Sequence, residues 1–147
     1  SRTSVTLVKV LAKFFWKIKP VFLDAREGFE KLIEGNTAAV IIGDRCFDLN
    51  GKFAFEYDLS AEWKKYTDMP FVFAAWVSNK KIEDDFIAEF EKALTFGLEH
   101  IKEAVQKNIP ADKQKLVITY LTERISYDLD EEKRKSMQHF LSLLKQL

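Results

Sequence analysis

Two short and entirely apolar runs constrain what this chain can fold into more than any other feature. Residues 38–42 read AAVII and residues 71–77 read FVFAAWV, and neither run contains a charged side chain. Runs of this length, rich in β-branched and aromatic residues, are typical of strands that are covered on both faces. The alternating segment 53–57 and the short run 21–23 predict two further strands.

The second half of the chain has a helical period instead. Apolar residues recur every three or four positions over 82–108, again over 110–125, and again over 131–144, where Asp130 is the predicted N-cap. The first half also contains helical spacing over 3–15, with Thr3 or Ser4 as the predicted N-cap. Shorter helices are predicted at 27–34 and after Asp58 or Ser60. The sequence therefore predicts an α/β first half followed by a helical second half.

Composition excludes several classes of protein. The chain has 147 residues, enough for one ordinary domain, and 23 basic residues balance 23 acidic ones, so no overall charge favours nucleic acid or an anionic membrane. No apolar stretch reaches the roughly 18 residues of a membrane-spanning helix. The single Cys46 forms no intramolecular disulfide, which fits a reducing, cytoplasmic compartment. Because the chain opens on SRTSV without Met, we expect a piece of a longer protein.

The segment SRTSVT at the start of the first helix is one candidate binding site. It brings hydroxyl groups, free backbone N–H groups, the helix dipole and the charge of Arg2 to one place, which suits a carboxylate or phosphate. An ordinary Ser/Thr cap explains the same residues, and from the residues alone the cap is favoured.

Asp44 is the second candidate. It follows five apolar residues and Gly43, which allows a sharp turn or a close approach to a ligand. The carboxylate of Asp44 can orient a substrate hydroxyl, act as a base, or cap the turn that begins at Arg45, and the cap is the commonest of these roles.

Other residues give weaker signals. An aromatic set either lines a pocket for a ring-shaped ligand or belongs to the core, and the core is favoured. Its members are Tyr57, Trp63, Tyr66, Phe71, Phe73 and Trp76. His100 and His139 lack partners at metal-ligand spacing, so no metal site is predicted. Cys46 has no evident His partner and is predicted to be a small buried thiol.

Together these segments resemble one family. SRTSV, AAVIIGD followed by Phe47-Asp48-Leu49, YDLSAEWKKYTDMPFVFAAWV and YLTERISYDLDEEKRKSMQHF occur in the order seen in chorismate dehydratase. That enzyme belongs to the futalosine route of menaquinone biosynthesis. The resemblance spans nearly the whole chain. The related dihydroxynaphthoate synthase lacks the IGD followed by YDL-x-x-x-W, so the dehydratase is preferred.

The resemblance implies a fold, a reaction and a site. The fold would be α/β, part of a two-lobed, type II periplasmic-binding-protein-like architecture, with residues 1–68 in one lobe and 69–147 providing a crossing strand and helices for the other. The lyase would remove water from chorismate to give 3-[(1-carboxyvinyl)oxy]benzoate, with no metal or organic cofactor. Arg2, Thr3, Ser4 and Val5 would hold a substrate carboxylate. Gly43 and Asp44 would face the cleft, with Asp44 as the candidate catalytic group.

Departures from the family pattern limit these expectations. Asp68 replaces a Gly before Pro70, which is minor because Asp tolerates turn geometry. The family's N-terminal segment, most of one lobe, is absent, so we expect this chain to be inactive alone. Two other readings stay open: a solute-binding protein of the same fold that binds a small anion without chemistry, and a fragment that self-associates through its exposed helical stripe.

Overall fold

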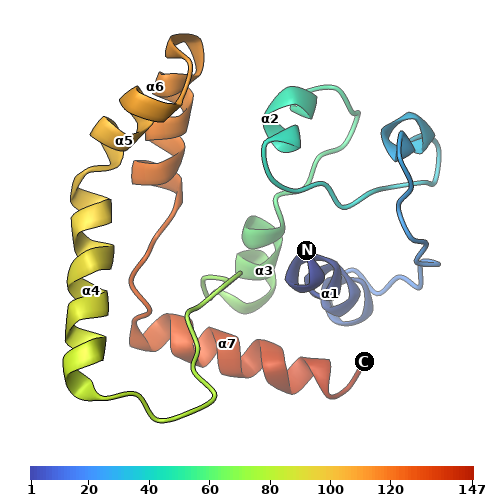
Figure 1. The fold of residues 1–147 in the computed structure, drawn as a ribbon. Coiled ribbons are helices and arrows are strands. Elements are labelled where there is room, and N and C mark those ends of the chain that lie inside the picture. The colour runs from blue at the N-terminus through green and yellow to red at the C-terminus, as the bar shows by residue number, and fades with distance from the viewer. The chain divides into compact units, whose positions relative to one another are not determined.

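The structure is a computed structural model that describes residues 1–147, and every regular element in it is helical (Figure 1). Seven α-helices are connected by loops and by three shorter segments, one of them 3₁₀ and two of them π. In chain order the elements are α1 (Arg2–Val10), the π segment η1 (Leu11–Phe15), the 3₁₀ segment η2 (Phe29–Leu32), α2 (Arg45–Leu49), α3 (Leu59–Thr67), α4 (Asp84–Glu99), α5 (Ile101–Asn108), α6 (Ala111–Thr119), the π segment η3 (Tyr120–Arg124) and α7 (Glu131–Leu144).

The predicted α/β fold class is wrong for this structure, and with it the periplasmic-binding-protein-like architecture. Segments 21–23, 38–42, 53–57 and 71–77 form no strand and no sheet. An apolar, β-branched sequence favours an extended backbone, but a strand exists only when a neighbouring segment accepts and donates the ladder hydrogen bonds. No segment of the chain pairs in this way, so the four segments are loops.

The predicted helices agree with the structure more closely than the predicted strands do. Asp130 Oδ1 accepts a hydrogen bond from Lys133 N at 2.8 Å, so Asp130 caps its helix as predicted. Of the two predicted caps of α3, Asp58 and Ser60, the structure uses Asp58, whose Oδ1 accepts from Ala61 N at 2.8 Å. The helix predicted over 82–108 is two helices, because the backbone of His100 departs from helical geometry between α4 and α5. Asp68 ends α3 in the left-handed conformation (φ 59°), the geometry that a Gly would adopt.

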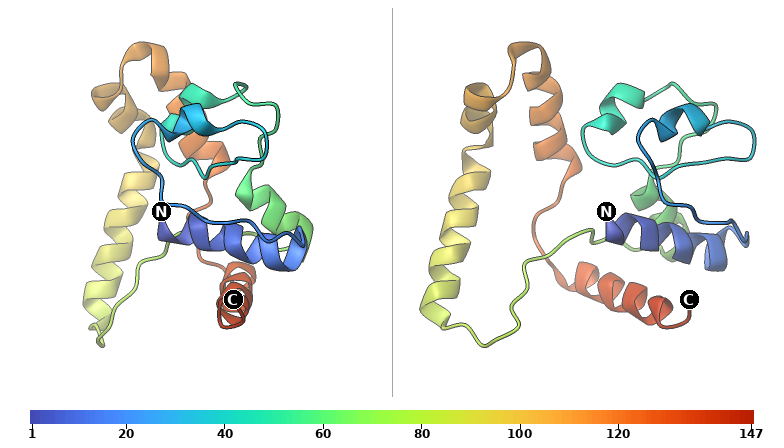
Figure 2. Two further views of the ribbon diagram at one scale, coloured as in Figure 1. Left: turned by 90° about the vertical axis from the view of Figure 1, so that its right-hand side faces the viewer. Right: turned by 45° about the vertical axis from the view of Figure 1, so that its right-hand side comes forward.

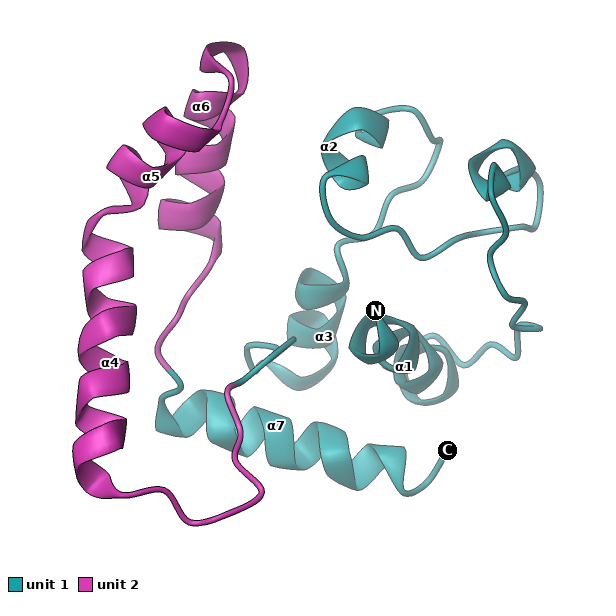
Figure 3. Ribbon diagram, viewed as in Figure 1, with its two compact units in different colours: residues 1–75, 129–147 teal, residues 76–128 magenta.

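The chain divides into two compact units (Figure 3). Unit 1 comprises residues 1–75 and 129–147, and unit 2 comprises residues 76–128. Unit 2 contains α4, α5, α6 and η3; α5 packs against α6, where the Gln114 amide donates to the Ile109 carbonyl at 2.8 Å. Val105 is the one residue of unit 2 that is buried. The predicted lobes 1–68 and 69–147 remain a prediction.

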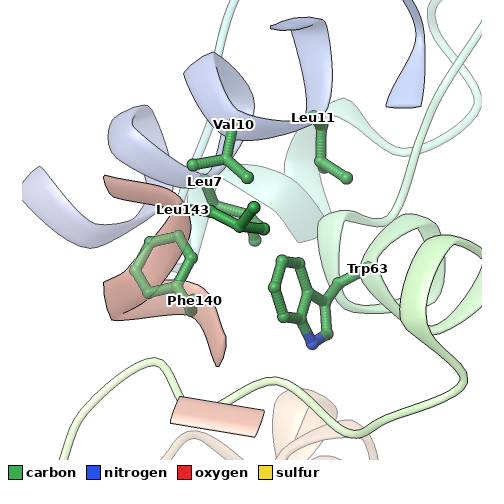
Figure 4. Packing of buried hydrophobic residues seen from close by; sticks show 6 residues of the cluster. All are labelled: Leu7, Val10, Leu11, Trp63, Phe140 and Leu143. Atoms are coloured by element: carbon green, nitrogen blue, oxygen red, sulfur yellow. The ribbon is translucent and has the colours of Figure 1, made fainter. Parts of the chain in front are cut away.

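The core lies in unit 1, where α1 packs on both α3 and α7 (Figure 2). Side chains from the three elements converge on Trp63 (Figure 4). The cluster consists of Leu7, Val10, Leu11, Trp63, Phe140 and Leu143, all at most 7% exposed. Leu7, Val10 and Leu11 recur at helical spacing on one face of α1 and η1, which is why this amphipathic segment buries that face. The core thus fixes α1, the element whose first turn carries the candidate anion site.

Two tryptophans tie the helices of unit 1 together through hydrogen bonds. The Trp63 indole Nε1 donates to Ser136 Oγ of α7 at 2.9 Å, and the Trp16 indole Nε1 donates to Glu62 Oε2 of α3 at 3.0 Å. Both acceptors are almost completely buried, at 0% exposure for Ser136 and 5% for Glu62. Buried polar groups need such partners, and no buried side-chain nitrogen or oxygen lacks one.

Candidate functional site

The start of α1 is the first part of the candidate site. Ser1, and not Thr3 or Ser4 as predicted, is the N-cap: its Oγ accepts from Ser4 N at 3.3 Å. The Thr6 hydroxyl donates to the Arg2 carbonyl at 2.8 Å, so that hydroxyl is already engaged. Ser4 is buried at 5% exposure, while Arg2 and Val5 are exposed.

This geometry leaves specific groups available to an anion. The backbone N–H groups of Arg2 and Thr3 lie in the first turn, where a helix offers no carbonyl acceptor for them. The Arg2 guanidinium is exposed beside them, and no acidic residue lies in the first turn. A carboxylate approaching this end would meet two backbone donors, the positive end of the helix dipole and one full positive charge.

Gly43 and Asp44 form the second part of the candidate site. Gly43 has a left-handed backbone (φ 72°), and a side chain at this position would meet no other atom within 4 Å, so the requirement for Gly comes from the backbone angle alone. Asp44 precedes α2 at the N-cap position, but its carboxylate makes no capping hydrogen bond. The carboxylate is exposed and therefore accessible to a ligand.

The structure does not bring these two parts into one pocket. No hydrogen bond or ion pair joins residues 1–5 to Gly43 or Asp44. Of the two cavities described in the chain, neither is lined by Arg2, Thr3, Ser4, Val5, Gly43 or Asp44. No described hydrogen bond, ion pair or cavity therefore joins the two parts of the candidate site.

A cavity beside Asp44 was not predicted. It has a volume of about 530 Å³ and is bounded by η2 and α2, where the Arg45 guanidinium contacts Glu30 at 3.2 Å. Glu27 and Asp48 also line it, so three carboxylates surround one guanidinium. That balance of charge disfavours a dianionic ligand. Only the tertiary contact of η2 with α2 creates this cavity, and the sequence contains no motif that indicates it.

The aromatic set divides between core and surface. Trp63 is buried, and its ring meets Phe71 edge-on at 5.4 Å and Tyr66 at 6.1 Å, so these members are core, as favoured. Tyr57, Phe73 and Trp76 are exposed and line neither cavity.

Cys46 is exposed, which corrects its prediction as a buried thiol. Partial desolvation nevertheless raises the pKa of the Cys46 thiol.

Glu62 is the chemically unusual residue that sequence reasoning missed. Hydrogen bonds from Lys65 Nζ at 2.6 Å and from the Trp16 indole lower the pKa of the Glu62 carboxyl, in that order of importance. The only sequence signal was the Glu-Lys spacing of three residues within α3, which usually indicates an exposed pair. Glu62 lines neither cavity, so the arrangement secures η1 against α3.

Comparison with known families decides the identity of the chain. A family model described as menaquinone biosynthesis matches residues 1–146. The chain belongs to the menaquinone biosynthesis family. The match confirms the family resemblance read from SRTSV, AAVIIGD and the YDL-x-x-x-W segment. No solved structure matches the chain.

Membership of the menaquinone biosynthesis family assigns the chain a role in that pathway. Two further findings concern metal binding and membrane-spanning helices. No group of three or more His, Cys, Asp or Glu side chains is placed to hold a metal ion. None of the helices is both long enough and apolar enough to cross a membrane.

Proposed function

We propose that the member of the menaquinone biosynthesis family to which this chain belongs dehydrates chorismate to 3-[(1-carboxyvinyl)oxy]benzoate. Family membership supports the pathway, and the resemblance of AAVIIGD and YDLSAEW to chorismate dehydratase supports the reaction. The observation that carries the proposal is the first turn of α1, where backbone donors and Arg2 stand free of acidic neighbours. The substrate is a dicarboxylate, and such a turn suits one of its two carboxylates.

The reaction makes simple demands on the protein. Chorismate loses a ring proton and its hydroxyl group, together one water molecule, and the ring becomes aromatic while the enol ether is kept. Because aromatisation supplies the driving force, the protein has to hold two carboxylates, place a base near the departing proton and assist the departing hydroxyl. None of these steps requires a change of redox state.

The candidate residues divide these tasks between them. Arg2 and the backbone donors at Thr3 and Ser4 hold a carboxylate; Ser4 contributes through its N–H, because its side chain is buried. The Val5 N–H donates to the Ser1 carbonyl at 3.3 Å within the helix, so Val5 offers no backbone donor. The bound carboxylate would take over the Ser4 N–H that Ser1 now accepts. Gly43 lets the backbone turn so that Asp44 is presented, and the Asp44 carboxylate acts as base or orients the hydroxyl. The substrate's own carboxylate is the competing base.

The decisive experiment follows the diene absorbance of chorismate with the natural full-length protein. We expect loss of the absorbance, and a decrease in kcat of about a hundredfold or more for Asp44→Asn if Asp44 is the base. Asp48→Asn, in the same short helix, is the matched control and should leave the rate unchanged. Binding of chorismate without any loss of absorbance would favour the solute-binding alternative and contradict the dehydratase.

The same assay tests the 147-residue chain by itself. Because Arg2 and Asp44 line no common pocket in the structure, we expect no turnover by this chain in the absence of other protein. Turnover by the chain alone at the full-length rate would contradict this expectation without affecting the proposed reaction.

A further inference from the structure

The chain exposes far more surface than a folded protein of its mass. Its accessible surface is 12,197 Å² for 17.1 kDa, whereas a folded monomer of that mass exposes about 7,800 Å². Two entirely separate folded bodies of the sizes of unit 1 and unit 2 would expose about 9,300 Å² by the same scaling. An excess of about 3,000 Å² therefore remains, which is more than each partner buries in a typical obligate interface, about 1,000–2,500 Å².

Helix α4 is exposed along nearly its whole length. Of its sixteen residues only Phe90 is partly buried, and the rest are exposed. At 100° per residue, Phe86, Phe90 and Leu94 form one apolar stripe, and the Phe86 and Phe90 rings stack at 6.2 Å. Amphipathic helices normally bury such a stripe. Nothing in unit 2 covers the stripe of α4 beyond the contact of Phe90 with the Trp76 ring at 5.3 Å.

The flanks of this stripe are strongly acidic. Asp84 and Glu91 lie along one edge of the stripe and Glu89 along the other. Helix α4 contains five acidic residues and a single basic one, Lys92, which pairs with Glu89 at 2.7 Å. Two α4 helices packed against each other would therefore repel, so the helix needs a basic, apolar partner surface.

Unit 1 contains a surface of that description. A groove of about 820 Å³ runs along the end of α1, with an apolar floor that includes Ala12, Ile18, Phe22 and Leu144. Four lysines line it, Lys9, Lys13, Lys17 and Lys19, and no acidic side chain does. The Lys13 ammonium donates to the Gln146 carbonyl, and the Lys9 ammonium lies 5.2 Å from the Phe22 ring centre. None of the four lysines forms a salt bridge in the structure.

We propose that the lysine-lined groove of one copy of this chain receives the acidic, apolar α4 helix of a second copy. The apolar stripe would lie on the groove floor, as in other helix-in-groove complexes, and the flanking carboxylates would meet the lysines. The zero formal net charge of the chain imposes no overall repulsion between copies. Each copy carries one groove and one α4 helix, so a reciprocal exchange between two copies would give two equivalent contacts.

Sedimentation velocity over a wide range of protein and salt concentration tests this proposal. We expect the 147-residue chain to self-associate, and the association to weaken as salt rises, because the contact joins opposite charges. Lys9→Glu combined with Lys19→Glu should weaken association about tenfold or more. The control, Lys64→Glu combined with Lys52→Glu, also changes one lysine in the last turn of a helix and one in a loop, but outside the groove, and should have no effect.

Further substitutions in α4 distinguish this contact from nonspecific association of exposed apolar side chains. Phe86→Ser should weaken association, whereas Phe96→Ser should not, because Phe96 points away from the stripe although it is equally exposed, at 62% against 58%. Glu91→Lys should weaken association alone and partly restore it when combined with the two groove substitutions. Far-UV circular dichroism checks that each variant keeps its helices. A strictly monomeric chain, or association that ignores all of these substitutions, would overturn the proposal.

Discussion

The indole Nε1 of Trp63 donates a hydrogen bond to Ser136 Oγ at 2.9 Å, although 73 positions separate the two residues in the sequence. Both side chains are fully buried, and they join α3 to α7. The ring of Trp63 lies in the core beside Leu7, Phe140 and Leu143 (Figure 4). The indole N–H is the only polar group of the Trp63 side chain, and the Ser136 hydroxyl is its acceptor. The bond therefore fixes how α7 sits beneath α1 and α3.

Replacing Ser136 tests this role. Ser136→Ala should lower the free energy of unfolding by about 1–3 kcal/mol, since it leaves the buried Trp63 N–H without an acceptor. Urea denaturation followed by tryptophan fluorescence measures the change. Ser142→Ala on the same helix is the control: Ser142 is exposed and donates only to the His139 carbonyl of its own helix, so the change should be within about 0.5 kcal/mol. Equal effects of both substitutions would show that the Trp63 bond contributes nothing.

The Glu62 carboxylate makes stability depend on pH. Its pKa is lowered in the folded chain by Lys65 and Trp16, so the folded state favours the ionised form more than the unfolded state does. The resulting stabilisation is present above the unfolded pKa of about 4.5 and is lost as pH falls through the lower, folded pKa. Urea midpoints measured from pH 7 down to pH 3 should therefore fall across the acidic end of this range.

Glu62→Gln isolates that contribution. The variant should be less stable than the parent at pH 7. The difference should shrink as pH falls from about 4.5, where the carboxyl of the unfolded parent becomes protonated, through the lower pKa of the folded parent. Glu34→Gln is the control, because Glu34 is exposed and forms no salt bridge, and the stability of this variant should follow the parent at every pH. A difference between parent and Glu62→Gln that stays constant with pH would refute the role assigned to the Glu62 charge.

Gly43 and Gly97 should respond to alanine in opposite directions. Gly43 has φ of 72°, so Gly43→Ala should destabilise the chain by about 1 kcal/mol, although space for the methyl group is open. Gly97 lies within α4 with a helical backbone and equally open surroundings, so Gly97→Ala should stabilise α4 by about 0.5–1 kcal/mol. Thermal unfolding followed at 222 nm reports both changes. Destabilisation by both substitutions would mean that something other than the backbone angle constrains these sites.

Cys46 should react as an accessible but weakly nucleophilic thiol. It is exposed, so alkylating reagents reach it without unfolding of the chain. Desolvation raises its pKa from the ordinary value of 9.0, and the thiolate is the reactive form, so alkylation near neutral pH should be slower than that of a free cysteine. The rate of iodoacetamide modification against pH, measured by mass spectrometry, should therefore rise with a midpoint above 9.0. A midpoint near neutral pH would instead indicate an activated thiol.

Helices and their caps could be predicted because their signals are local. The spacing of Leu7, Val10 and Leu11 and the capping carboxylates of Asp58 and Asp130 act within one or two turns, so the sequence contains the whole interaction. The strands could not be predicted in the same way. The run 71–77 has the composition of a strand, but a ladder needs a second segment at a defined register, and no local pattern states whether that segment is present.

The candidate site also has one part that could be predicted from local sequence and one part that depends on tertiary structure. The donors at the start of α1 follow from SRTSV, since any helix that begins there leaves its first N–H groups free. Whether Asp44 faces those donors depends on the path of the chain over the intervening residues, and the structure leaves the two apart. The lysine-lined groove was not predicted for a related reason: its lysines belong to α1, η1 and the loop after them, whereas Leu144 of its floor belongs to α7.

By itself the sequence determined the family of this chain and the approximate positions of its longer helices, because each depends on residues that are neighbours along the chain. Tertiary structure alone decided that the apolar runs do not pair, that Trp63 finds Ser136, and that Glu62 is buried with Trp16 and Lys65 as partners. Those outcomes depend on segments that lie far apart in the sequence, and a contact between such segments forms only where packing repays the entropy of bringing them together.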